Sequence, residues 1–245
     1  MSALLLLATT INIQAQYNYT TLSVPGPTFT VASGISGNDI VGYYYIGSST
    51  YGFLYNGSSY TTLSVPGAVA TYAQGISGDD IVGYYFIGSS TYGYLYNGSS
   101  YTTLSVPGAA YGISGDDIVG VYTIGSSVYG YLYNGSSYTT LNVPGAIQTV
   151  ALGVSGDDIV GNYSNDGTDD VGFLYNGSSY TMLSVPGAAD TYAQGISGND
   201  IVGYYQNGSG TFYGFLATPV PEPACLELLA VGATAFLASR RRRRR

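Results

Sequence analysis

The feature that most constrains this chain is a unit of about 41 residues that recurs five times. Three blocks mark each copy: Val-Pro-Gly, Gly-Ile/Val-Ser-Gly-Asx-Asp-Ile-Val-Gly, and Gly-Phe/Tyr-Leu. The Val-Pro-Gly blocks place their prolines at Pro25, Pro66, Pro107, Pro144 and Pro186. Self-similarity at this period is typical of architectures in which one small unit cannot bury its faces alone and must stack on its neighbours.

The second copy, which spans Gly75–Gly108, predicts four strands joined by tight turns. Strand-forming residues occupy Ala73–Ser77, Ile81–Ile87, Tyr92–Tyr96 and Tyr101–Val106. Gly78-Asp79 predicts a type II′ turn, 88–91 a loop, and Asn97-Gly98 a type I′ turn. Each unit is therefore expected to be a small antiparallel sheet.

Both faces of this sheet are apolar. Because side chains alternate along a strand, Tyr92, Tyr94 and Tyr96 point to one face together with Tyr101. Leu95 points to the other face with Leu104 and Val106. A sheet with two apolar faces has to lie between neighbours. Four-stranded units stacked in this way at a 40-residue period predict an all-β fold, a β-propeller.

The two ends of the array predict a closed ring of five blades. The fifth repeat stops after its third strand, Tyr213–Leu216, and the N-terminal region holds a spare fourth strand, Tyr19–Val24. The spare strand would complete the last blade, whereas an open solenoid would need atypical capping repeats. The expected blades are 31–65, 72–106, 110–143, 150–185, and 192–216 together with 19–24.

Charge is distributed very unevenly. All six cationic residues are Arg240–Arg245, and of the 14 acidic residues only Glu222 and Glu227 lie outside the repeats. The repeats therefore carry 12 Asp and no Lys, Arg or His, so binding to a nucleic-acid backbone is not expected. The single cysteine, Cys225, allows no disulfide within the chain.

The two ends of the chain predict export and a domain order of 1–15, 16–218 and 219–245. Residues 1–15 have the short apolar run of a signal peptide, although the basic start of such a peptide is missing; a buried first strand is the alternative. The tail joins the linker Pro219–Pro223 to the apolar stretch Ala224–Ser239, expected to be a helix, and the arginines. The 16 residues of this apolar stretch are fewer than a full membrane span needs. Basic residues after such a stretch stay on the cytoplasmic side, which leaves the repeats outside.

The tail resembles a PEP-CTERM sorting signal. The resemblance covers about 26 residues: the Pro-Glu-Pro box, the apolar stretch Leu226–Leu237 and the basic end. It implies processing by an exosortase, a membrane transpeptidase of Gram-negative bacteria, after transient anchoring in the inner membrane. It also implies delivery to the cell surface or the exopolysaccharide matrix. The sorting residues it implies are Val220, Pro221, Glu222, Pro223, Arg240, Arg241, Arg242, Arg243, Arg244 and Arg245.

The body resembles the HAF-type extracellular repeats. In the second copy the resemblance is carried by Gly75-Ile76-Ser77, Ile81-Val82-Gly83 and Gly93-Tyr94-Leu95, and it extends over about 200 residues. That family implies an extracellular location and a repeat architecture, and no activity.

The acidic residues suggest a metal site at one place only. The pairs Asp79-Asp80, Asp116-Asp117 and Asp157-Asp158 follow a glycine and are adjacent, so they fit turns better than a shared ion. The loop Asn165–Asp170 of the fourth repeat differs from the other copies, and its oxygen ligands suit Ca²⁺. Asp166, Asp169 and Asp170 are the candidate ligands, and a solvated loop is the alternative.

The chemistry of the repeats favours binding over catalysis. The body has no His, Lys or Cys to activate a serine, and its acidic residues recur as equivalents, which disfavours a glycosidase. Tyrosines could stack on sugar rings, although packing between the blades is the favoured explanation for them. The sequence therefore predicts a non-enzymatic, exported surface or matrix protein without a cofactor; the alternatives are a carbohydrate-binding propeller with surface polysaccharide as partner and, less favoured, a glycoside hydrolase.

Overall fold

The structure is a computed structural model that describes residues 22–27, 29–105 and 108–219. Within these ranges it is all-β, with nineteen strands and no helix, as the sequence predicts. The first ten strands are β1 (Thr30–Ser36), β2 (Asp39–Ile46), β3 (Ser49–Tyr55), β4 (Tyr60–Leu63), β5 (Ala70–Ser77), β6 (Asp80–Ile87), β7 (Ser90–Tyr96), β8 (Tyr101–Thr103), β9 (Gly108–Ser114) and β10 (Asp117–Ile124). The remaining nine are β11 (Ser127–Tyr133), β12 (Tyr138–Leu141), β13 (Gln148–Ser155), β14 (Asp158–Ser164), β15 (Val171–Tyr175), β16 (Tyr180–Leu183), β17 (Ala188–Ser197), β18 (Asp200–Asn207) and β19 (Phe212–Ala217).

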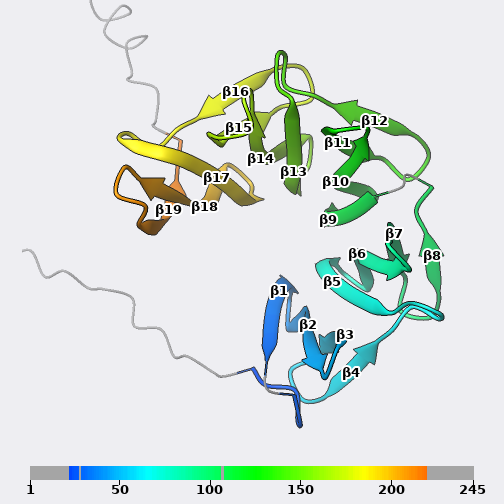
Figure 1. The fold of residues 1–245 in the computed structure, drawn as a ribbon. Coiled ribbons are helices and arrows are strands. Elements are labelled where there is room, and N and C mark those ends of the chain that lie inside the picture. Colours follow the sequence, from blue (N-terminus) through cyan, green and yellow to red (C-terminus); the bar gives the residue numbers. More distant parts are fainter. Residues whose placement is uncertain (1–21, 28, 106–107, 220–245) are drawn as a thin grey trace, which may run out of the picture.

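The strands form five radial antiparallel sheets, which we call blades. Blade 1 is β1–β4, blade 2 is β5–β8, blade 3 is β9–β12, blade 4 is β13–β16 and blade 5 is β17–β19. Figure 1 shows the first strand of each blade nearest the centre and the fourth strand at the periphery. A single parallel residue pair also joins blades 1 and 2, and another joins blades 3 and 4. This is the propeller-like arrangement that the repeats predict.

Of the two tight turns predicted in each repeat, one forms as the sequence predicts and the other does not. The Gly78-Asp79 turn has Gly78 at φ +59° and no positive φ at the aspartate, as the predicted type II′ turn requires. The type I′ prediction at Asn97-Gly98 is wrong, because only Gly98 has a positive φ. The loop is four residues long: the side-chain Oδ1 of Asn97 accepts hydrogen bonds from the backbone N–H groups of Ser99 and Ser100 at 3.2 and 2.9 Å.

Most strand boundaries agree with the sequence, but the 88–91 segment does not form the predicted loop. Ile87 pairs with Ser90 across the two-residue turn Gly88-Ser89, so β7 begins at Ser90. The predicted faces are confirmed for the described residues, and Val106 lies outside them. Tyr94 packs with Val65 and Tyr85 on one face, and Leu95 packs with the cluster that holds Val82 and Leu104 on the other.

Adjacent blades meet through a repeated set of contacts that we call the inter-blade interface. A valine on the second strand of each of blades 1–4 is fully buried against the next blade: Val41, Val82, Val119 and Val160. Between blades 1 and 2, Val41 packs with Ala73, Ile76 and Ile81 of blade 2. These contacts remove the aliphatic face of each blade from water and so form a large part of the buried core.

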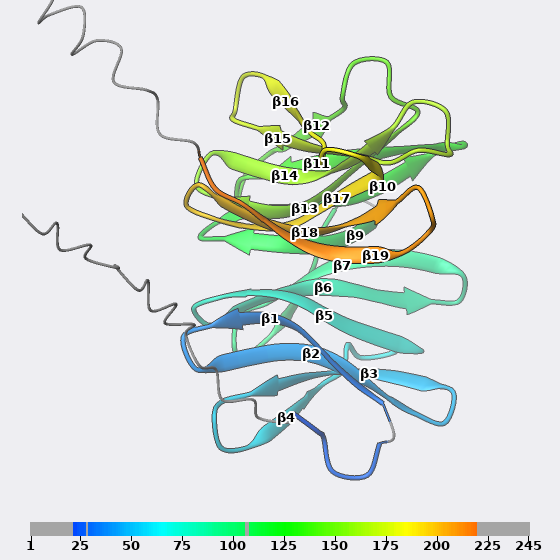
Figure 2. The same cartoon turned by 90° about the vertical axis from the view of Figure 1, so that its left-hand side faces the viewer.

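Closure of the ring between blades 5 and 1 is not seen in the described residues. Blade 5 has three strands there, and no described segment pairs with the outer edge of β19. Of the predicted closing strand Tyr19–Val24, residues 19–21 lie outside the described ranges, and Leu22–Val24 is not a strand. Figure 2 views the molecule from the side of the opening between β1 and β19.

Two further predictions fall outside the described ranges. The signal peptide at 1–15 and the sorting residues from Val220 onward cannot be compared with this structure. Among the residues that are described, no helix has the length and apolarity needed to cross a bilayer.

Candidate ligand-binding pockets

The face of each blade that carries Tyr94 and its equivalents is built from aromatic rings. In blade 2 the ring of Tyr94 lies 5.5 Å from that of Tyr101, and Tyr85 lies 5.5 Å from Tyr92. The hydroxyl of Tyr85 is also hydrogen-bonded to Oγ1 of Thr103 at 2.8 Å. Blades 1 and 3 repeat this bond between Tyr44 and Thr62 and between Tyr122 and Thr140.

Open pockets lie on this face in blades 3 and 4. The blade 3 pocket has a volume of about 300 Å³ and is lined by Ser105, Tyr122, Thr123, Ile124, Tyr131, Tyr138, Thr139 and Thr140. The blade 4 pocket has a volume of about 450 Å³ and is lined by Val143, Pro144, Tyr163, Phe173, Ser178, Ser179, Tyr180, Thr181 and Met182. The two pockets occupy equivalent places in the repeat, because the second, third and fourth strands of each blade line them.

The blade 4 pocket departs from the repeat in a way that changes its chemistry. Met182 stands where blades 1–3 have the threonine that bonds the tyrosine hydroxyl, and 64% of its surface is exposed. Tyr163 occupies the position of that tyrosine, and the described residues give its hydroxyl no hydrogen bond. The pocket therefore combines an apolar rim with a phenolic hydroxyl that can still donate and accept.

Neither pocket is lined by a charged side chain. The linings consist of aromatic rings, aliphatic side chains and the hydroxyls of Ser, Thr and Tyr. Such a surface can stack against an apolar face and exchange hydrogen bonds, but it has no acid, base or cation with which to hold a phosphate or a metal ion. This chemistry suits a neutral ligand with many hydroxyl groups.

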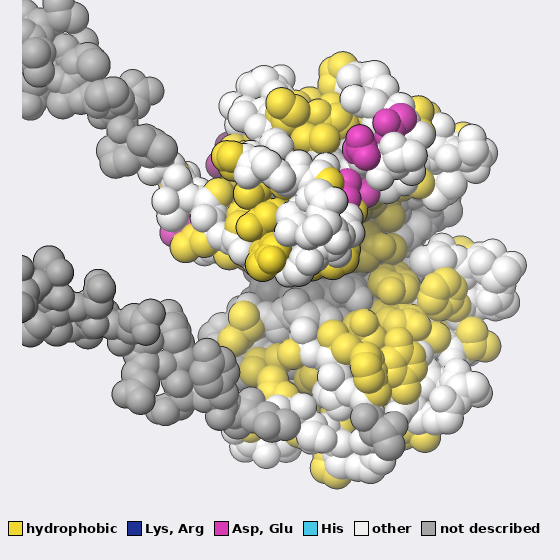
Figure 3. All heavy atoms as spheres, turned by 60° about the vertical axis from the view of Figure 1, so that its left-hand side comes forward, with side chains coloured by type: hydrophobic (Ala, Val, Ile, Leu, Met, Phe, Trp, Pro, Cys, Tyr) yellow, Lys and Arg dark blue, Asp and Glu magenta, His cyan; other side chains and the backbone are white. Residues whose placement is uncertain are grey.

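A second aromatic surface runs across the inner part of blades 1–3. Tyr43 of blade 1 contacts Tyr72 of blade 2 at 4.9 Å between ring centroids, and Tyr72 stacks on Tyr84 at 4.7 Å. Tyr84 then reaches Tyr111 of blade 3 at 6.0 Å. Figure 3 shows hydrophobic side chains on the lower part of the molecule, where blades 1 and 2 lie, and also on the upper part, where the acidic side chains of this view are found. These rings are partly buried and bridge the blades.

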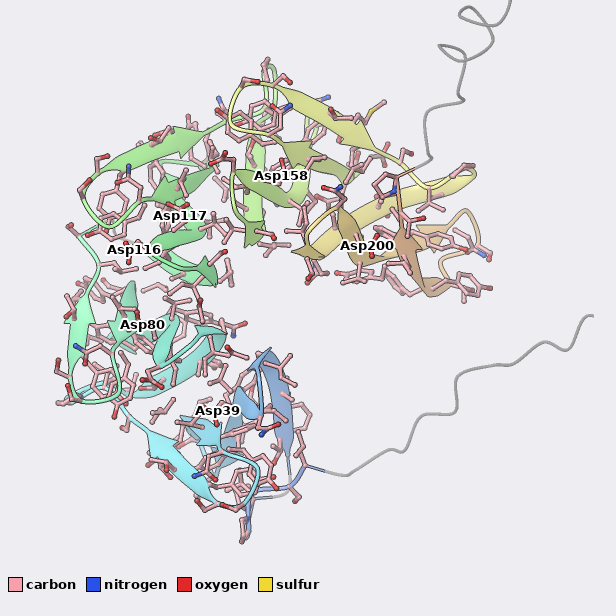
Figure 4. The ribbon with its side chains drawn as sticks, turned by 180° about the vertical axis from the view of Figure 1, so that it is seen from behind. Asp39, Asp80, Asp116, Asp117, Asp158 and Asp200 are labelled. Carbon is pink, nitrogen blue, oxygen red and sulfur yellow. The ribbon has the colours of Figure 1, made fainter. Side chains whose placement is uncertain are left out.

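The acidic pairs lie at the turns, as predicted. Figure 4 shows Asp39, Asp80, Asp116, Asp117, Asp158 and Asp200 distributed around the ring, with each blade supplying its own residues. Asp80 pairs with Ser77 across the turn that Gly78 begins. Carboxylates from different blades do not converge on one point, so they give no shared catalytic centre.

The loop of blade 4 does not assemble the predicted calcium ligands. Asp166 Oδ1 accepts from the backbone N–H groups of Thr168 and Asp169 at 2.9 and 3.2 Å, which lowers the pKa of Asp166 to about 2. Asp170 instead accepts a hydrogen bond at 2.8 Å from the side-chain amide of Asn162. In the part of the chain that the structure describes, no group of three or more acidic residues is arranged to hold a metal ion. The three aspartates remain without a structural argument for Ca²⁺.

The loop is joined to blade 5 through Asp190, a residue that the sequence analysis did not single out. Asp190 is 8% exposed and accepts a hydrogen bond at 2.9 Å from the backbone N–H of Asp170. Burial and the neighbouring carboxylates Asp170 and Asp190 raise the pKa of Tyr192. The hydrogen bond between Asp170 and Asp190 thus links the blade 4 loop to blade 5.

The comparisons with known proteins give structural neighbours but no family. No family model matches the chain, and no curated protein matches it. An Asn-to-Gln mutant of the lectin from Aleuria aurantia, in complex with Fucalpha1-6GlcNAc, is 17% identical over 80% of each chain, with a TM-score of 0.44. A second structure of this mutant, in complex with alpha-methyl-L-fucoside, is 18% identical over 80% of this chain and 79% of the lectin, with a TM-score of 0.45.

Proposed function

We propose that this protein binds carbohydrate without transforming it, and that the blade 4 pocket is its principal site. The observation that carries the proposal is the lining of that pocket: aromatic rings and hydroxyls, no charge, and the Tyr163 hydroxyl left without an internal partner. A sugar ring offers C–H groups to an aromatic face and hydroxyls to Ser, Thr and Tyr. The pocket volume, about 450 Å³, lies within the usual range for small-ligand sites.

Equivalent faces in the other blades favour a polymeric ligand. The blade 3 pocket has the same kind of lining but a smaller volume, and its Tyr122 hydroxyl is already bonded to Thr140. Weak sites held on one rigid frame strengthen binding to a repeating chain by raising the effective concentration of the second site. A surface or matrix polysaccharide therefore fits the arrangement better than a free monosaccharide.

The place of action is part of the same proposal. The tail from Val220 to Arg245 would direct the exported protein to the cell surface or matrix after processing by an exosortase. A reporter fused to this tail should be processed in an exosortase-bearing host, and replacing Pro221 and Glu222 by alanine should prevent it. A reporter that stays unprocessed with the intact tail would refute the sorting proposal and leave the binding proposal untouched.

Glycan-array screening of the full chain, followed by calorimetry, tests the binding proposal. Tyr163→Phe should weaken binding roughly 2- to 10-fold, the loss expected for one hydrogen bond. Met182→Thr should weaken it too, because a threonine there restores the internal bond that blades 1–3 make to the equivalent tyrosine. Tyr55→Phe is the matched control, since Tyr55 donates to the carbonyl of Gly57 in a turn of blade 1.

Three results would count against this assignment. If the intact protein binds no glycan at high concentration, the function is wrong. If it binds but both blade 4 variants bind equally well, the pocket is wrong. If affinity falls instead in Tyr84→Ala, the aromatic surface of blades 1–3 is the site.

A further inference from the structure

The blade 4 pocket lacks two hydroxyl groups that the blade 3 pocket carries. Met182 stands in the place of Thr140, and Phe173 in the place of Tyr131. The blade 4 pocket is also the larger of the two, at about 450 Å³ against about 300 Å³. The more apolar lining and the greater room should decide which sugar this pocket accepts.

Tyr163, Phe173 and Met182 lie on one face of blade 4. Phe173 pairs with Gly161 of β14 and with Met182 of β16, and directly opposite side chains of an antiparallel pair share a face. Tyr163 lies two residues after Gly161, so alternation along β14 places its ring on that face too. Phe173 is fully buried, whereas 64% of the Met182 surface is exposed. A ligand in the pocket can therefore reach the thioether side chain of Met182.

Blade 3 shows how close the positions of Tyr163 and Met182 are to each other. The equivalent residues there, Tyr122 and Thr140, are hydrogen-bonded through their hydroxyl groups at 2.8 Å. The thioether of Met182 is only a weak acceptor and cannot replace that bond. Among the described residues the hydroxyl of Tyr163 has no hydrogen-bond partner. The pocket consequently holds an O–H donor beside an apolar side chain.

The serine hydroxyls of the lining already have partners within the protein. Ser178 and Ser179 both donate to Oδ1 of Asn176, at 2.9 and 3.2 Å. The proton of Tyr163, by contrast, is available to a ligand. An acceptor that binds Tyr163 also lies against Met182, because the two side chains are neighbours.

An acetyl group suits that position better than a sugar hydroxyl does. A hydroxyl placed against Met182 would lose the water bound to its own O–H without gaining an acceptor, which costs free energy. An acetyl carbonyl oxygen only accepts, so it can take the Tyr163 proton, and the acetyl methyl group leaves water favourably. Anionic sugars are disfavoured, because the repeats carry 12 Asp and no cationic residue.

Given that this pocket binds carbohydrate, as proposed above, we infer that it selects neutral sugars that bear an acetyl group over the same sugars with a free hydroxyl there. The carbonyl oxygen accepts from the Tyr163 hydroxyl, and the methyl group packs on Met182. The blade 3 pocket gives no such preference, because Thr140 already engages Tyr122. The partner is thus an acetylated polysaccharide, with the acetyl group joined through nitrogen or through oxygen.

Calorimetry of the full chain with matched neutral glycans tests this inference. Chitotetraose and cellotetraose have the same linkage and differ only in the acetamido group that replaces one hydroxyl of each sugar. Chitotetraose should bind roughly 10- to 50-fold more tightly, the gain from one buried methyl group and one hydrogen bond. Acetylated glucomannan, compared before and after mild alkaline deacetylation, is the arm for oxygen-linked acetyl groups. The arm that shows the preference identifies the linkage.

Variants of the pocket locate the preference. Met182→Thr should reduce it to about 2-fold or less, because the threonine engages Tyr163 and removes the apolar contact. Met182→Leu keeps an apolar side chain and should retain most of the preference, which a general loss of folding would not allow. Tyr163→Phe should weaken the binding of chitotetraose more than that of cellotetraose. Tyr55→Phe, in a turn of blade 1, is the control and should change neither.

The outcomes distinguish failure of this inference from failure of the proposed function. Equal binding of both members of each pair, or glycan-array hits confined to sugars without acetyl groups, overturns the inference and leaves carbohydrate binding in place. A preference that survives in Met182→Thr means that the acetyl group is recognised elsewhere, and it overturns the inference too. If no glycan binds, acetylated or not, the proposed function and the inference are both wrong.

Discussion

At the scale of single residues, the least satisfied polar groups are two phenolic hydroxyls. Tyr94 and Tyr131 are 0% and 1% exposed, and their hydroxyls have no hydrogen-bond partner within the described residues. Burial raises the pKa of both. Blades 1 and 4 place Phe53 and Phe173 at the same position, so the fold does not need the hydroxyl there.

Tyr94→Phe should therefore stabilise the protein. Removing a buried hydroxyl that lacks a partner recovers its desolvation cost, about 1–3 kcal/mol, which for a chain of this size raises Tm by a few degrees. Thermal denaturation monitored by circular dichroism measures the change. Phe53→Tyr is the reciprocal variant and should lower Tm; a destabilised Tyr94→Phe would mean that the hydroxyl has a partner.

Asp166 gives a pH-dependent effect confined to one loop. Its pKa is lowered to about 2 because its carboxylate accepts backbone hydrogen bonds from Thr168 and Asp169. The contribution of this carboxylate to folding is present above its ordinary pKa of 3.8 and is lost as the pH falls towards 2. Carboxyl chemical shifts should report this pKa, and Asp166→Asn, which keeps the acceptor oxygen, should preserve the loop conformation. A normal pKa would show that the turn is open.

At the scale of elements, the Asn-Gly-Ser-Ser loop determines how β7 returns as β8. Asn97 does not use the left-handed conformation that a type I′ turn needs; its side chain binds two backbone N–H groups instead. Asn97→Gly, which a type I′ turn would accept, should destabilise the protein by about 0.5–1.5 kcal/mol through the lost hydrogen bonds. Asn97→Asp keeps the acceptor and is the control. Urea denaturation measures both, and a neutral Asn97→Gly would favour the two-residue turn.

Strands and blade faces could be predicted from the sequence because alternation depends on neighbouring residues alone. The turn was missed because its geometry depends on a side-chain acceptor and on two amides further along. The blade 4 pocket was missed because three strands build it. The one sign of this pocket in the sequence is Met182, which interrupts the repeated Tyr-Thr-Thr-Leu. Its effect can be recognised only in the structure, where the equivalent Thr140 is hydrogen-bonded to Tyr122. The structure does not support the predicted calcium site, because the carboxylates of Asp166 and Asp170 accept hydrogen bonds from different groups.

At the scale of the whole molecule, the tyrosines couple folding to alkaline pH. Burial raises the pKa of Tyr84, Tyr94 and Tyr131 above the ordinary tyrosine value of 10.0. Their contribution is fully present below pH 10 and declines at higher pH, because the unfolded chain releases these protons first.

The denaturation midpoint should accordingly fall between about pH 10 and 12. Absorbance of tyrosinate should rise in two stages, with the buried hydroxyls ionising only as the fold is lost. A single titration near pH 10 of all 28 tyrosines, with the circular dichroism spectrum unchanged, would contradict this expectation.

The position of Val24 has a consequence for circular permutation. Since Val24 packs on blade 1 as Val65 packs on blade 2, the junction into blade 1 has the same form as the internal junctions. In the closed ring that the repeats predict, a permuted chain that joins Ala217 to Tyr19 through a linker and opens at Gly67 should fold with every blade intact. The break in the polypeptide could then be moved from one junction to another while the packing stays the same.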